Sequence, residues 1–279
     1  MNPQAIIDGL ISGSTIGLGA IGLTLTYSIL RFANFTHGDF LAWGAYLTLT
    51  VAGVLGGLAA GLGAPVYPFS FGWGLPLAML GGVALTVALT LGLDHVLFGR
   101  LRARGADAII IVMASFGASM ALRSLLEFIF TAKPAYFTKA LQIAKPLGLG
   151  MRATPDQLLV IGLTALLVLA LHLLVTRSAT GRAMRAVSEN PSLAGVMAGL
   201  LVQIRPYMGF DLLLPLFSAA ILGGIGSIPG AMLGGLIIGL SEAFAVQIIG
   251  AEWRATISFV ILVIVLMLRP QGLFGQKEA

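Results

Sequence analysis

Long runs of apolar residues alternate along the chain with short polar connections. The first run, residues 5–30, contains a single charged residue, Asp8. Comparable runs cover residues 40–62, 74–98, 108–130, 158–176, 231–249 and 255–268, and a shorter one covers residues 210–225. Most approach or exceed the ~20 residues that a helix needs to cross a bilayer. Because the runs are continuous, unlike the weak alternating segments of a membrane barrel, they predict transmembrane helices.

We therefore predict an all-α fold: a polytopic transmembrane helical bundle of about seven to eight membrane segments, forming a single domain over residues 1–279. Glycines recur at every fourth residue in two places. They are Gly9, Gly13 and Gly17 in the first run, and Gly226, Gly230 and Gly234 near the run at 231–249. This spacing places small residues on one helix face, where two backbones can approach closely. We predict that these six glycines are packing positions.

Composition agrees with a membrane protein. Of the 279 residues, 58% are hydrophobic and 10% are charged, and the mean hydropathy is +0.99. A soluble domain has about 25% charged residues. The absence of cysteine excludes disulfides and zinc–thiolate sites. The net charge of +5 does not indicate nucleic-acid binding, because the basic residues lie in short connections between apolar runs, where orientation signals belong.

The basic residues also predict an orientation. One set of connections and the tail carry nine of them: Arg31, Arg100, Arg102, Arg104, Arg177, Arg182, Arg185, Arg269 and Lys277. The alternate set carries Lys133, Lys139, Lys145 and Arg152. By the positive-inside rule, the first set is cytoplasmic and the N-terminus is outside. Eight crossings would then leave the Arg269 tail outside, against its charge. Either residues 210–225 are re-entrant, or a span is missing near residue 200.

Sequence motifs typical of nucleotide-binding proteins and of enzymes are absent or lie in an unsuitable context. Residues 17–22 match a dinucleotide-binding glycine pattern, but they lie inside an apolar run with no strand before them. There is no Gly-Lys pair of a phosphate-binding loop and no Gly-x-Ser-x-Gly elbow. The histidines His37, His95 and His172 form no metal-binding pair. The chain is therefore predicted to be no enzyme, with no catalytic residues, no metal and no cofactor of its own.

A polar cluster joins the first two runs. Asn34, Thr36, His37, Gly38 and Asp39 follow one another between strongly apolar segments. Thr36 is predicted to cap the following helix, and Asp39 to favour its positive end. Polar side chains at membrane depth are costly unless they are buried in protein or line a cavity. We expect Asn34 and His37 either to line a pathway or to brace the first two helices.

A second segment, residues 177–199, reads as two short helices joined at Asn190. Ala183 and Val187 share one helix face, as do Leu193 and Met197. Asn190 and Pro191 match a helix cap followed by proline at the first helical position. The pattern is typical of a docking surface for a soluble partner, with a helix lying on the membrane as the alternative.

At these segments the chain resembles the permease subunits of branched-chain amino acid ABC transporters, and the H-type more than the M-type. The resemblance extends over nearly the whole length. Its motifs are residues 31–39, 181–199, 206–210, 223–230 and 269–274, with Thr36 where alanine is usual. In the family a further spanning helix follows the segment at 181–199, and here Gly199 runs almost directly into Leu200.

The resemblance implies the partners and the site. A second, M-type permease would complete a heterodimer in the bilayer of the bacterial cytoplasmic (inner) membrane. Two ABC ATPase subunits would bind ATP and Mg²⁺, and a periplasmic substrate-binding protein would deliver a branched-chain amino acid. The residues that would couple to the ATPase are Gly181, Arg182, Arg185, Glu189, Asn190, Pro191, Ala194 and Gly199.

Other transport classes remain open at this stage. A permease for urea or short amides shares the same resemblance. An ion-coupled secondary transporter or channel would need charges within the membrane, and the candidates are Asp94, Arg123, Glu127 and Glu242.

Overall fold

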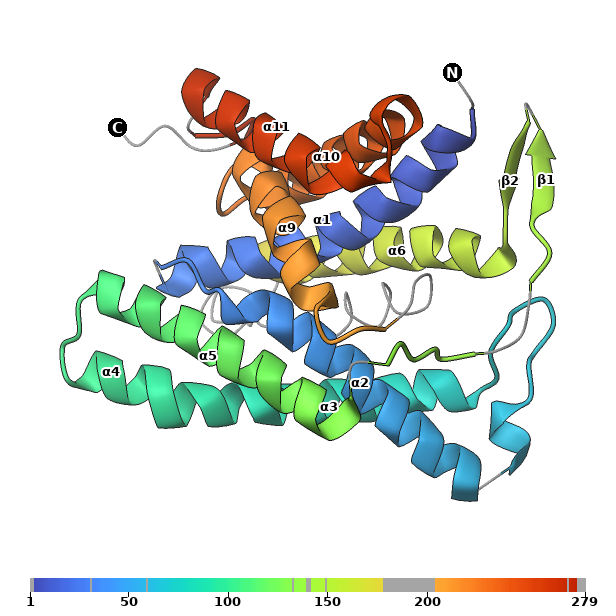
Figure 1. Cartoon of the computed structure of the whole chain (residues 1–279), viewed down its shortest axis with the longest axis horizontal. Coiled ribbons are helices and arrows are strands. Elements are labelled where there is room, and N and C mark those ends of the chain that lie inside the picture. Colours follow the sequence, from blue (N-terminus) through green and yellow to red (C-terminus); the bar gives the residue numbers. More distant parts are fainter. Residues whose placement is uncertain are drawn as a thin grey trace. The chain divides into compact units, whose positions relative to one another are not determined.

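The computed structural model describes residues 3–30, 32–58, 60–131, 133–138, 142–148, 150–177, 204–269 and 271–274 (Figure 1). The helices are α1 (Gln4–Leu30), α2 (Thr36–Leu58), α3 (Gly74–Leu93), α4 (Gly99–Ala103), α5 (Ala108–Phe130), α6 (Pro155–Arg177), α9 (Met208–Gly223), α10 (Ile228–Ile249) and α11 (Arg254–Leu268). Short helical turns are η1 (Ala60–Gly63), η2 (Asp94–Phe98) and η3 (Ala251–Trp253), and the strands are β1 (Lys145–Gly148) and β2 (Met151–Ala153).

The predicted polytopic helical fold is confirmed. In the described residues, seven helices are long and apolar enough to cross a membrane, and α9 is a shorter apolar helix. At 1.5 Å per residue, the 16 residues of α9 extend about 24 Å, less than the ~30 Å of a hydrocarbon core. The structure corrects the placement of Arg100 and Arg102. They do not lie in a loop, because α3 continues through the π-helical turn η2 into α4, which carries both residues.

The chain divides into two compact units. Unit 1 contains residues 1–30, 143–189 and 211–279, and unit 2 contains residues 31–142 and 190–210. Unit 1 thus holds α1, the β1–β2 hairpin, α6, α10, α11 and most of α9. Unit 2 holds α2, α3, η2, α4, α5 and the segment that leads into α9. The sequence predicts a single permease domain over residues 1–279, and this stays a prediction.

In unit 1, α1 and α10 pack backbone against backbone through glycines on both helices. A Cβ atom added at Gly13 would lie 2.8 Å from the Cα atom of Leu236, and one added at Gly9 would lie 2.8 Å from the Cα atom of Leu240. Gly17 faces Met232 in the same way. The contact is reciprocal, since α10 presents Gly235 to the backbone of Gly17 and Gly239 to the backbone of Gly13.

Other glycines of α10 face α9. Gly230 lies against the carbonyl group of Gly223, and Gly234 lies against that of Ala219. Gly226, by contrast, does not share this helix face. It precedes α10 in a turn with φ of +90°, a backbone conformation that glycine adopts without steric cost. The helix begins only after Ser227, whose hydroxyl oxygen accepts a hydrogen bond of 3.1 Å from the Gly230 N–H group.

The end of α9 is capped by the C-terminal segment of the chain. The last carbonyl groups of a helix have no partner inside the helix, and in lipid they cannot use water instead. Here the Leu273 N–H group donates to the Leu222 carbonyl over 2.8 Å, and the Phe274 N–H group donates to the Gly223 carbonyl over 3.1 Å. Two of the segments that carried the resemblance, 223–230 and 269–274, therefore meet in unit 1.

A two-stranded antiparallel hairpin precedes α6, an addition to the predicted helices that Figure 1 shows as two arrows. It is joined to the start of α1 through Gln4. The Gln4 amide donates to the Arg152 carbonyl over 3.0 Å, and the Arg152 N–H group donates to the Gln4 side-chain oxygen over 2.8 Å.

Large apolar side chains remain exposed on several helices. Only 6% of the apolar span formed by η3 and α11 (Ala251–Leu268) and 17% of the most apolar part of α6 is buried within the chain. Met267 and Leu268 of α11 are 79% and 78% exposed. A water-soluble protein rarely leaves such contiguous apolar surface uncovered, whereas lipid accepts it.

The glycine packing leads to a prediction. Gly239→Ala places a methyl group against the backbone of Gly13, so we expect a loss of about 1–3 kcal/mol of stability, as in other overpacked sites. The matched control is Gly162→Ala in α6 of the same unit, where an added Cβ meets nothing within 4 Å. Alanine favours helix over glycine, so this control should be neutral or stabilising. Thermal unfolding midpoints in detergent test the pair. Equal midpoints for both variants would contradict the packing role of Gly239.

Candidate functional site

The polar cluster at residues 34–39 forms the beginning of α2, and its members are almost completely buried. Asn34 is 3% exposed, and His37 and Asp39 are each 1% exposed. The prediction that Thr36 caps α2 is wrong. Instead the Asn34 side-chain oxygen accepts hydrogen bonds from the Thr36 N–H group over 3.1 Å and from the Thr36 hydroxyl over 2.6 Å. Asn34 therefore stabilises the start of the helix, and Thr36 is its first residue.

Asp39 is bound to α5 by side chains on two successive turns. The Ser119 hydroxyl donates to one carboxylate oxygen. The other oxygen accepts from the Nε and Nη2 groups of Arg123, each over 3.3 Å. A buried carboxylate is tolerated only when it is paired and hydrogen-bonded, and Ser119 and Arg123 meet both conditions. The role predicted for Asp39, an interaction with the end of its own helix, therefore omits its main partners.

The Arg123 guanidinium also lies against two aromatic rings. Its central carbon is 4.3 Å from the centre of the Phe210 ring and 5.6 Å from that of the Tyr207 ring. Both distances fall within the ~6 Å of a cation–π interaction. Both rings are also partly open, because Phe210 is 49% exposed and Tyr207 is 50% exposed. The arginine thus links α5, the start of α2 and the segment before α9.

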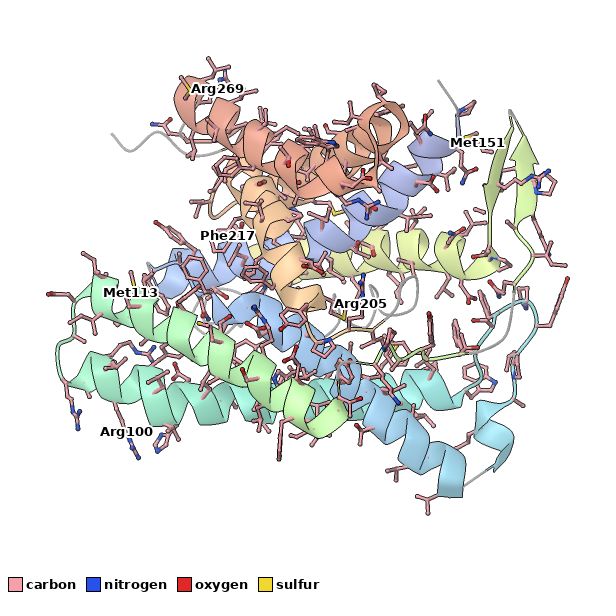
Figure 2. The ribbon with its side chains drawn as sticks, viewed as in Figure 1. Arg100, Met113, Met151, Arg205, Phe217 and Arg269 are labelled. Carbon is pink, nitrogen blue, oxygen red and sulfur yellow. The ribbon has the colours of Figure 1, made fainter. Side chains whose placement is uncertain are left out.

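That segment, residues 204–210, is held to unit 2 by backbone contacts as well. Ile204 and Ala135 exchange two backbone hydrogen bonds of 2.9 and 3.0 Å, and the Tyr46 hydroxyl donates to the Ile204 carbonyl over 3.3 Å. Gly209 lies so close to the Gly38 carbonyl that a Cβ atom would clash with it. Two further segments that carried the resemblance, 31–39 and 206–210, are therefore in contact. Arg205, labelled in Figure 2, lies in the same segment just before α9.

Glu127 lies one helical turn beyond Arg123 on α5, and it completes the cluster. Glu127 raises the pKa of Tyr207 above its usual value, first as a hydrogen-bonding partner of the Tyr207 hydroxyl and then through its negative charge. Arg123, Glu127, Tyr207 and Phe210 together present a cation, an anion, a hydroxyl group and two aromatic faces. We call these four residues the α5 cluster.

Unit 1 contains a different buried polar group. Glu242 of α10 is 2% exposed and accepts a hydrogen bond from the Ser258 hydroxyl of α11. Ser218 of α9 donates to the Ser258 carbonyl over 2.9 Å. The Arg254 guanidinium is at 4.0 Å from Glu242 and is 55% exposed. These contacts join three helices, and they keep the buried acid hydrogen-bonded inside the protein.

A cavity of about 330 Å³ lies in unit 2, away from these charges. Its lining includes Leu62, Pro65, Phe71, Phe137 and Thr138, and none of its described lining residues is charged.

The other predicted site residues divide by location. The residues predicted to couple to an ATPase (Gly181, Arg182, Arg185, Glu189, Asn190, Pro191, Ala194 and Gly199) lie outside the described residues. Of the charges considered for ion coupling, Asp94 forms an exposed pair of 2.8 Å with Arg102, and Glu242 is hydrogen-bonded as above.

The sequence pointed to Arg123 and Glu127 as charges within an apolar run, but it did not point to Ser119, Tyr207 and Phe210 as their neighbours. The signal was the Arg123–Glu127 spacing of four residues, which places both on one helix face.

These observations define the class of protein to which the chain belongs. The chain is a multi-pass helical membrane protein with exposed apolar helices and internally paired buried charges. It matches the family described as "Branched-chain amino acid transport system / permease component" over residues 5–199 and 192–266, and it belongs to that family.

Curated relatives agree with the family match. The permease protein BraD of the high-affinity branched-chain amino acid transport system in Pseudomonas aeruginosa is 31% identical over 309 residues, covering 99% of this chain and 96% of the relative. The corresponding LivH of Escherichia coli is 29% identical over 306 residues, with the same coverage. A probable LivH of Methanocaldococcus jannaschii is 25% identical over 320 residues, covering 99% of this chain and 93% of the relative.

The alignments also show that this chain is shorter than its relatives internally. The 309 aligned positions with BraD exceed the 279 residues of this chain by 30, although the chain is covered almost completely. The two family matches overlap at residues 192–199, so the same residues align at the end of one match and at the start of the next.

The Asp39–Arg123 pair yields a prediction about stability. Asp39→Ala leaves a mostly buried guanidinium without its counter-ion, so we expect a loss of about 3–5 kcal/mol. The double variant Asp39→Leu with Arg123→Met removes both charges and should lose less than Asp39→Ala alone. Thermal unfolding midpoints in detergent measure the difference.

The control for this prediction is Asp94→Ala, which breaks the pair with Arg102 in the same unit. Because its side chains are 38% and 42% exposed, the expected loss is about 0–1 kcal/mol. An Asp39→Ala variant as stable as Asp94→Ala would show that the buried pair does not hold unit 2 together.

Proposed function

We propose that this chain is the membrane-spanning permease subunit of an ABC importer for branched-chain amino acids, located in the bacterial cytoplasmic membrane. The observation that carries the proposal is the family match across residues 5–266, together with relatives aligned to 99% of the chain. The substrate class comes from what those relatives are named to transport. The chain supplies part of the translocation pathway, and it leaves ATP hydrolysis to partner subunits, which bind ATP and Mg²⁺.

The proposed partners follow from the same family. They are a second, M-type permease subunit, two ABC ATPases and a periplasmic substrate-binding protein. The exposed apolar surfaces of α6 and α11 support contact with lipid or with another membrane subunit.

The segment at residues 177–199 is proposed to couple the permease to the ATPases. It lies in the chain between α6, which belongs to unit 1, and the segment 204–210, which belongs to unit 2. A force applied to such a connection acts on both units at once. Movement of the ATPases could therefore shift both the polar cluster of unit 2 and the helices of unit 1.

The coupling proposal is tested by reconstitution. The full assembly with Glu189→Ala or Gly181→Leu should take up leucine at least about tenfold more slowly per ATP hydrolysed. This corresponds to a loss of about 1.4 kcal/mol of coupling, within the usual range. Lys145→Ala, in β1, is the matched control, and it should behave as the unsubstituted assembly. Full uptake per ATP in both coupling variants would exclude this segment as the coupling element.

The same assembly separates the proposal from its alternatives. Leucine uptake that requires ATP inside the vesicles and survives an ionophore supports the importer. Uptake driven by an ion gradient without ATP would indicate an ion-coupled carrier instead. Uptake of urea or short amides in place of leucine would redirect the substrate assignment.

Membrane topology is a separate proposal. We infer that α9 does not cross the membrane completely, so that the N-terminus lies outside and the basic tail at Arg269 lies in the cytoplasm. Support comes from the length of α9, about 24 Å, which is less than the ~30 Å of a hydrocarbon core.

The absence of native cysteine makes this topology testable with single cysteines. In intact spheroplasts, an impermeant maleimide should label Pro3→Cys and Ile143→Cys, and it should label Arg104→Cys and Gln271→Cys only after the membrane is opened. All four positions are exposed. Labelling of Gln271→Cys from outside would mean instead that α9 crosses fully and that the chain lacks one span of its relatives.

A further inference from the structure

We propose that the α5 cluster, made of Arg123, Glu127, Tyr207 and Phe210, is a binding site for the zwitterionic head group and the apolar side chain of an α-amino acid. The inference rests on the proposed function and adds the residues that contact the substrate. In it, the Arg123 guanidinium binds the α-carboxylate, the Glu127 carboxylate binds the α-ammonium group, and the Phe210 ring packs against the aliphatic side chain.

The first argument is the arrangement of charge. Arg123 and Glu127 are four residues apart on α5, so they are neighbours on one helix face, about 6 Å apart at Cβ. A positive and a negative group at this separation offer one partner to each of the two charges of an amino-acid head group, while Asp39 stays paired with the guanidinium.

The second argument is hydrogen-bonding capacity. Arginine has five N–H groups, and the bonds described for Arg123 in this part of the chain use Nε and Nη2, both toward a single oxygen of Asp39. A carboxylate such as that of Glu127 can accept about four hydrogen bonds. The two bonds to Asp39 also hold the guanidinium in place, so the arginine is oriented before a ligand arrives.

The third argument concerns the aromatic rings. Phe210 and Tyr207 contact the guanidinium, yet each remains about half exposed. A half-exposed aromatic ring beside a charged pair offers an apolar surface next to a polar one, which is the composition of a small-molecule site. An aliphatic side chain on Phe210 would be dehydrated there, whereas glycine would gain nothing from the ring.

The fourth argument is position. Glu127 and Arg123 lie three and seven residues before Phe130, the last residue of α5, so they lie about 5 and 10 Å from that helix end. This is the end that leads into residues 131–155, proposed to face outside. A substrate released from an external binding protein would reach this depth first.

The experiment measures equilibrium binding of radiolabelled leucine to the purified assembly of both permeases and both ATPases, without the binding protein. Two competitors each lack one charge: 2-hydroxy-4-methylpentanoate has no ammonium group, and 3-methylbutylamine has no carboxylate. For the unsubstituted assembly, each should bind at least about tenfold more weakly than leucine, the loss of one charge-assisted contact. The variant Glu127→Gln should weaken leucine to the level of the hydroxy acid and leave the affinity for the hydroxy acid unchanged.

Further variants separate recognition from folding. Phe210→Ala should weaken leucine binding and leave glycine binding unchanged. Asp107→Asn, an exposed acid at the opposite end of α5 whose side chain makes no capping bond, is the matched control and should change neither. Elution of each variant as an intact assembly verifies its folding.

The outcomes are distinct. Unchanged leucine affinity in Glu127→Gln, or equal weakening of leucine and the hydroxy acid, would overturn this site and leave the importer proposal intact. Failure of the unsubstituted assembly to bind leucine, while the full assembly still takes leucine up with ATP, would also overturn this site. Failure of the full assembly to take leucine up with ATP would instead remove the proposed function on which the site rests.

Discussion

A carboxylate buried in a membrane helix must find its partners inside the protein, and Asp39 satisfies this requirement through α5. Ser119 and Arg123 bind its two oxygens, and Arg123 then meets the rings of Tyr207 and Phe210. An isolated charge at this depth would cost several kcal/mol, so the pairing fixes which turns of α2 and α5 face each other. The same arginine brings the segment before α9 to that contact.

The helix α9 is held at its first residues by contacts in unit 2 and at its last residues by contacts in unit 1. Its first residues, 208–210, belong to unit 2, where Gly209 lies against the Gly38 carbonyl. Its last carbonyl groups, in unit 1, are capped by the N–H groups of Leu273 and Phe274. Both attachments are made by backbone or by glycine, and neither leaves room for a larger side chain. A short helix fixed so tightly at both ends links the two units through the chain itself.

Much of the fold could be predicted from the sequence, because lipid imposes a simple rule on it. Continuous apolar runs are expected to be helices, and all eight of them contain one: seven long helices and the shorter α9. The face of Gly9, Gly13 and Gly17 followed from their spacing. Gly226 was assigned incorrectly because the four-residue period continued past the start of α10, where Ser227 with Pro229 marks the helix N-terminus. The capping of α2 by Asn34, in place of Thr36, depends on a choice between adjacent polar residues that spacing does not decide.

The candidate site could be predicted only in part, and the reason lies in its contacts. Asp39 and Arg123 are 84 residues apart in the chain, and Arg123 and Phe210 are 87 residues apart, so no local pattern joins them. Hydropathy identifies Arg123 as a charged exception within an apolar run, but it does not identify Asp39 or Phe210 as its partners. Their meeting is a consequence of the cost of leaving a charge unpaired in lipid. Such exceptions are therefore the positions at which a membrane sequence reports function. Each retained charge must be paired, and among the described residues Arg123 has N–H groups beyond those that its bonds to Asp39 use.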